Sequence, residues 1–184
     1  MRGHRHRLLT LGVLVGTSAL LGAGFPTKTV SPEKWVKSVC TALGTWADDL
    51  AAAQEDVDQD ETDLERRQGD LAEYLDEVTD ATNTLVKRLK KAGRPGVDNG
   101  KGVTRAFRRG FSQARDTFAD AADDAEALET EDRSQFDEDV LEIQDAIRAG
   151  AADISATFDD AEEKYDVPEL DEAFDDEAAC SGIT

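Results

Sequence analysis

A run of basic side chains in an otherwise acidic chain is the sequence feature with the clearest chemistry. Between Lys87 and Arg115 there are ten Lys or Arg residues and one acidic residue, Asp98, which gives a local charge of +9. The candidate anion-binding patch within this run consists of Lys101, Arg105, Arg108, Arg109 and Arg115. All of these except Arg109 fall along one stripe of a predicted helix, so we expect them to face an anionic partner together.

Two interpretations of this patch are open. In the first, it contacts an anionic cell-envelope surface, either phospholipid headgroups in a peripheral membrane contact or an anionic wall polymer. In the second, it is neutralised by carboxylates near the C-terminus, namely Glu169, Asp171, Glu172, Asp175, Asp176 and Glu177. Nucleic acid is not an expected partner, because a pI near 4.3 repels a polyanion at range and no aromatic residues are interleaved with the basic ones.

The two cysteines, Cys40 and Cys180, form a candidate disulfide, because an even pair is expected to be oxidised outside the cytoplasm. In the topology predicted below, the chain returns to the end of the molecule where its first helix begins. The dozen residues after Pro168 are long enough to bring the second cysteine to the first. We expect an intramolecular bridge that stabilises the fold, and an intermolecular bridge is the alternative.

The remaining residue types argue against an enzyme. Both histidines, His4 and His6, lie in a predicted export signal, so the mature chain would lack the base that a Ser–His or Cys–His pair needs. Zinc would lack its usual ligands for the same reason. The stretch Asp56–Asp60 resembles the start of a calcium loop, but the turn glycine and the final glutamate are missing. We therefore expect no catalytic residues, cofactor or metal site, with a carboxylate-dependent hydrolase as a minor alternative.

The first 24 residues are typical of a secretory signal peptide. Arg2, Arg5 and Arg7 precede an apolar run, and the small residues Gly22–Gly24 follow it. We expect cleavage after Gly24, with an uncut membrane anchor as the alternative. Cleavage would remove three of the 21 basic residues and none of the 41 acidic ones, so the net charge would change from −20 to −23.

Apolar residues recur at alternating spacings of three and four along the rest of the chain, which is the pattern of helices that pack side by side. The sequence predicts an all-α fold, an up-and-down four-helix bundle with a short C-terminal helix, preceded by a signal peptide helix. Residues 25–31 would form a linker and residues 32–180 the bundle. The expected helices are 32–57, 62–92, 100–129, 131–166 and 168–179, and no strands are expected.

Local signals set the expected helix ends. Ser31–Pro32 combines a capping side chain with proline at the first helical position. Thr62 and Glu65 have the spacing of a capping box. Gly93–Gly96 ends the second helix, since it contains glycine for a left-handed cap and a proline that cannot continue the helix. Thr130, followed by two acidic residues, is expected to begin the fourth helix.

Three short motifs, Cys40–Trp46, Gly93–Gly102 and Phe174–Cys180, together resemble uncharacterised small secreted helical proteins of actinobacteria. The resemblance covers most of the mature chain. It implies an extracytoplasmic compartment, either secreted or attached to the cell envelope, and a helical fold, but no activity. The resulting hypothesis is a secreted, non-enzymatic bundle that binds an anionic envelope surface, with a self-associating envelope or matrix protein as the alternative.

Overall fold

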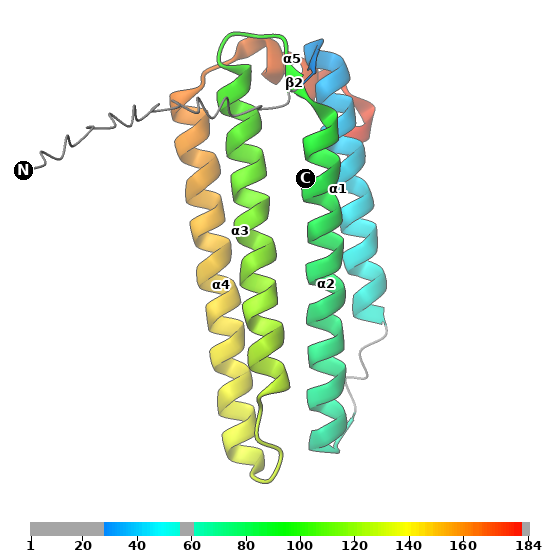
Figure 1. The fold of residues 1–184 in the computed structure, drawn as a ribbon, viewed down its shortest axis with the longest axis vertical. Coiled ribbons are helices and arrows are strands. Elements are labelled where there is room, and N and C mark those ends of the chain that lie inside the picture. The colour runs from blue at the N-terminus through cyan, green and yellow to red at the C-terminus, as the bar shows by residue number, and fades with distance from the viewer. Residues whose placement is uncertain (1–27, 56–60, 182–184) are drawn as a thin grey trace, which may run out of the picture.

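The computed structural model describes residues 28–55 and 61–181 of the 184-residue chain. Four long helices run up and down the molecule, and the short elements lie at one end of it (Figure 1). The described elements are β1 Thr29–Val30, α1 Pro32–Glu55, α2 Leu64–Ala92, β2 Arg94–Pro95, α3 Gly100–Glu126, α4 Arg133–Lys164, α5 Pro168–Asp176 and the 3₁₀ turn η1 Ala178–Cys180. The all-α bundle with a short C-terminal helix is confirmed.

The helices pack in sequence order, so the bundle is incompletely closed. Helix α2 packs on α1 and α3, and α3 also packs on α4, whereas α5 and η1 pack on α1. Within the described part of the chain, α4 has its extensive contacts with α3 alone. Within the described chain, α1 and α4 therefore do not close the bundle by packing extensively on each other.

Burial along the helices follows this arrangement. The spacing of apolar residues predicts a buried stripe along α2 from Leu64 to Leu89. Its members Leu75, Val78, Thr82, Leu85 and Leu89 are buried, whereas Leu64 and Leu71 are half-buried. The spacing predicts a second stripe along α4 from Phe136 to Tyr165, of which only Phe136 and Ile143 are buried. A helix with one close neighbour can bury only a narrow face, which accounts for the difference.

The core is divided into two clusters along the long axis. The cluster near the end that α5 covers contains Trp35, whose ring packs nearly perpendicular to the rings of Phe107 and Phe174 at centroid distances of 5.4 and 6.3 Å. The other cluster surrounds Phe136. Buried Thr82 lies on α2, where its Oγ1 accepts a hydrogen bond from Trp46 Nε1 at 3.0 Å and donates to the Val78 carbonyl at 2.7 Å.

The first helix begins where the sequence predicted, and the second begins with a different cap. Helix α1 starts at Pro32, and the hydroxyl of Ser31 donates to Glu33 and lowers the pKa of that carboxyl. Helix α2 is capped by Asp63, whose side chain accepts from the Arg66 amide at 3.2 Å. The predicted capping box is wrong. The Glu61 carboxylate instead accepts from the backbone amides of residues 62 and 63, at 2.7 and 2.8 Å.

The later helix ends also differ from the predicted ones. Helix α3 stops at Glu126, and α4 begins at Arg133, capped by Asp132, which accepts from the amides of residues 134 and 135 at 2.8 and 3.3 Å. A carboxylate two residues after Thr130 satisfies these amides, so the chain stays extended longer than predicted. The last predicted helix is divided into α5 and η1. The predicted end of the first helix at residue 57 lies outside the described residues.

A short parallel strand pair corrects two further expectations. Thr29–Val30 pairs with Arg94–Pro95, with backbone hydrogen bonds from Arg94 to Lys28 at 3.0 Å and from Gly96 to Val30 at 2.8 Å. Part of the predicted linker is thus paired backbone, and the expected absence of strands is wrong. Gly93 allows the approach, because it has a φ of 84° and a Cβ there would lie 2.3 Å from the Lys28 oxygen.

Cys40 and Cys180 form an intramolecular disulfide between α1 and η1, as predicted, with a Cα–Cα distance of 5.0 Å. The bond fits an oxidising, extracytoplasmic environment. Helices of the described ranges do not combine the length and apolar character needed to cross a membrane. The predicted signal peptide, residues 1–24, lies outside the described residues.

Candidate functional site

The first turns of α3 and strand β2 enclose a recess of about 560 Å³. It is called the basic recess below, and its lining residues are Arg94, Lys101, Thr104, Arg105, Arg108, Arg109 and Ser112. Five of the seven carry a positive charge, and none is acidic. The structure therefore brings four of the five predicted patch residues into one hollow.

Two side chains that line the recess each carry a buried polar atom without a hydrogen-bond partner among the described residues. Thr104 is 7% exposed, and its Oγ1 is unpaired with any described residue. Arg108 Nε is likewise buried and has no hydrogen-bond partner among the described residues. An unsatisfied buried donor costs on the order of 1–3 kcal/mol, so such atoms are rare without a reason. Both atoms are hydrogen-bond donors on side chains that line the recess.

The cations around these atoms are not neutralised by direct contact. Among the described residues, no carboxylate lies within the 4.0 Å of an ion pair from Lys101, Arg105, Arg108 or Arg109. The fifth cation, Arg94, donates from Nε to Thr29 Oγ1 at 2.8 Å. That bond and the strand pair hold Arg94 at the rim, so part of the recess is preorganised by the N-terminal strand.

Arg115 does not join the recess. Its Nε donates to Asp116 Oδ1 at 2.9 Å, and it is not a lining residue. Arg115 lies on α3, as the helical stripe predicted, but its counter-charge comes from the next residue in the chain, Asp116. Arg94 and Thr104 were not selected from the sequence. Arg94 belongs to the basic run and could have been included, whereas the burial of Thr104 leaves no signal in the sequence.

The acidic C-terminal segment makes no direct ion pair with the patch within the described residues. It packs on α1 instead. Two acidic residues of α4, Asp160 and Glu163, lie near the patch. They line a neighbouring recess of about 590 Å³ together with Arg105 and Arg109. The acidic groups that share a hollow with the patch therefore come from α4 and stay beyond ion-pair distance.

Metal ligands do not converge in the parts of the chain that are described, since no group of three or more His, Cys, Asp or Glu side chains is placed to hold an ion. The stretch Asp56–Asp60, which resembles a calcium loop in sequence, lies outside those parts.

Comparison with known proteins gave no match to any protein-family model, to the curated proteins or to the solved structures.

Proposed function

We propose that this protein is a secreted, non-enzymatic binding protein that attaches to phosphate-bearing anions of the cell envelope through the basic recess. The observation that carries the proposal is a recess lined by five cations, none of which has a carboxylate within ion-pair distance among the described residues. Two of its lining side chains also carry a buried donor without a described partner, Thr104 Oγ1 and Arg108 Nε.

The side chains of the recess favour a ligand with phosphate-like oxygens over diffuse attraction to any negatively charged surface. Guanidinium groups form paired hydrogen bonds to phosphate oxygens, and three arginines of α3 line this hollow. The recess supplies donors and positive charge, with no carboxylate, thiol or imidazole among its lining residues to act as a base or nucleophile. This composition supports binding rather than catalysis.

Two observations support an extracytoplasmic site of action. One is the signal-like first 24 residues of the sequence. The other is the disulfide, which would be reduced in most cytosols. Phosphate groups that a secreted protein meets there belong to lipid headgroups or to wall polymers, and both present the same oxyanion chemistry.

Cosedimentation with phosphatidylglycerol vesicles and with isolated wall fragments tests the proposal and separates the two sources. Substituting Arg105→Glu together with Arg108→Glu should weaken binding by about 100-fold, because each lost charge-assisted contact contributes about 1.5 kcal/mol or more. The matched control is Lys34→Glu with Lys37→Glu, which makes the same charge change at two exposed positions of α1. It should change binding by less than about threefold, since both sites lie outside the recess. Circular dichroism should show equal helicity in all three proteins.

Other outcomes would contradict the proposal. An equal loss of binding in both double variants would show that adsorption depends on net charge alone. Undiminished binding in the Arg105→Glu, Arg108→Glu variant would show that the recess is not the binding site. Sedimentation velocity of the protein alone addresses self-association. Oligomers that grow with concentration and dissolve in salt, without vesicle or wall binding, would favour an envelope protein that assembles by charge.

A further inference from the structure

A second hollow lies on the open side of the bundle, on a different face of α3 from the basic recess. It has a volume of about 900 Å³ and is enclosed by α3, α4, α5 and the segment that joins α4 to α5. Four phenylalanines from three helices line it, namely Phe107, Phe111, Phe158 and Phe174. It is called the aromatic groove below.

The rings form a continuous apolar wall. Phe107 packs against Phe158 at a centroid distance of 5.4 Å and stacks on Phe174 at 6.5 Å, with an interplanar angle of 9°. Phe111 extends the wall beyond Phe158, at 5.6 Å. In a closed four-helix bundle, α1 and α4 would cover these rings, but here the rings of Phe107, Phe158 and Phe174 are only half-buried.

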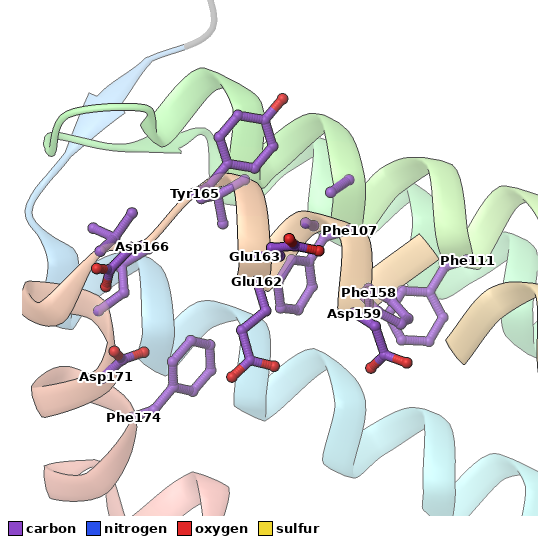
Figure 2. A pocket seen from close by; sticks show the side chains of 15 residues that line it. Phe107, Phe111, Phe158, Asp159, Glu162, Glu163, Tyr165, Asp166, Asp171 and Phe174 are labelled. Carbon is purple, nitrogen blue, oxygen red and sulfur yellow. The ribbon is translucent and has the colours of Figure 1, made fainter. Parts of the chain in front are cut away.

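Carboxylates surround the groove. Five acidic residues line it, and Figure 2 shows their side chains around the same opening as the rings: Asp159, Glu162, Glu163, Asp166 and Asp171. No Lys or Arg is a lining residue, and within the described chain none of the five carboxylates has an ion-pair partner. Lys164 is not a lining residue, and its Nζ lies 5.4 Å from the centroid of the ring of Tyr165, which is one.

From this combination we infer that the aromatic groove binds a small amphiphilic organic cation, with an apolar body and an ammonium head. The body would replace water on the phenylalanine wall, and the head would be held by the carboxylates and by the ring faces. An anion would be repelled by five carboxylates, and a neutral apolar ligand would make no use of them. The volume is that of a pocket for one small molecule.

The site is independent of the basic recess. The lining residues of the groove on α3 include Val103, Phe107 and Phe111, whereas those of the recess include Thr104, Arg108 and Ser112. If the aromatic groove bound no cation, the proposal of an anion site in the basic recess would be unaffected.

Isothermal titration with decyltrimethylammonium, below its micellar concentration, tests the inference. Decanoate and decyl maltoside share the chain length but replace the cation by an anion and by a neutral sugar. The cation should bind one-to-one and at least tenfold more tightly than either of them. Trp35 contacts two lining rings and should report the same event by fluorescence.

Charge-neutral variants locate the site. Glu162→Gln with Asp171→Asn should weaken cation binding at least tenfold. The matched control, Glu65→Gln with Glu73→Gln, removes the same charge from exposed positions of α2 and should change binding by less than twofold. Equal binding of decanoate, or equal loss in both double variants, would overturn the inference. Two other results would also overturn it. If a Leu/Lys amphipathic peptide bound tenfold more tightly than the cation and were displaced by it, the groove would hold a partner helix. If the protein formed a dimer that the cation dissociated, the groove would hold a second copy of the chain.

Discussion

The substitution Thr104→Val should raise stability and lower anion affinity at the same time. Thr104 is 7% exposed and its hydroxyl has no described partner, so the folded protein carries the cost of a buried unsatisfied group. Valine has nearly the same shape and no polar atom. Removing the hydroxyl should therefore stabilise the protein by about 1–3 kcal/mol. An oxyanion that accepts from this hydroxyl would lose one charge-assisted hydrogen bond of about 1.5–3 kcal/mol, which corresponds to a roughly 12- to 150-fold weaker affinity.

Urea denaturation with and without inorganic phosphate measures both effects. With a slope of about 2 kcal/mol per molar urea, the expected stabilisation moves the midpoint upward by roughly 0.5–1.5 M. Phosphate should raise the midpoint of the original protein more than that of the variant, because ligand binding to the native state stabilises it according to affinity.

Thr82→Val is the matched control, since Thr82 is also a buried helical threonine. Its hydroxyl is fully used, accepting from the Trp46 indole at 3.0 Å and donating to the Val78 carbonyl. The same substitution there should destabilise by about 1–3 kcal/mol, because it leaves the indole N–H without an acceptor. A lower midpoint for Thr104→Val, or a phosphate response equal to that of the original protein, would refute the reasoning about the recess.

Two further predictions concern the bundle. Reducing the disulfide, which joins residues 140 positions apart, should lower stability by up to about 5 kcal/mol in the chain-entropy estimate, or roughly 2.5 M in the urea midpoint. A change below about 1 kcal/mol on adding reductant would show that the bridge stabilises little. Asp132→Ala should cost about 1 kcal/mol, because its carboxylate caps α4, whereas Thr130→Ala should be near neutral. If thermal melts showed a larger loss of stability for Thr130→Ala than for Asp132→Ala, Thr130 would be the cap of α4, as the sequence predicted.

The sequence predicted the helices better than their ends. Periodic apolar positions identified the buried stripe of α2, because the 3.6-residue helical repeat fixes which side chains share a face. Three consecutive polar residues before α4 could each cap it, and Asp132 does so because its own backbone is extended. Residue type favours Asp only slightly over Thr at an N-cap, so it did not separate Asp132 from Thr130. The strand pair at Arg94 was also missed, since two-residue strands leave no periodic pattern.

The candidate sites were predictable only in part. The basic run located the anion site on α3, but only burial distinguishes Thr104 from the many solvated threonines. The aromatic groove was not predicted, because a closed bundle places Phe158 and its neighbours in the core. It exists because α4 packs mainly on α3, and pairwise helix packing of this kind is not encoded in the spacing of apolar residues on one helix.

The most direct test of the anion site is a titration with inorganic phosphate that follows the Nε–Hε resonances of the arginine side chains by NMR. Arg108 Nε is buried without a partner, and Arg115 Nε is already bonded to Asp116. A saturable shift of the Arg108 signal, with the Arg115 signal unchanged, is the predicted result. An Arg108 signal that stays in place at saturating phosphate, or that drifts in parallel with Arg115, would contradict the account.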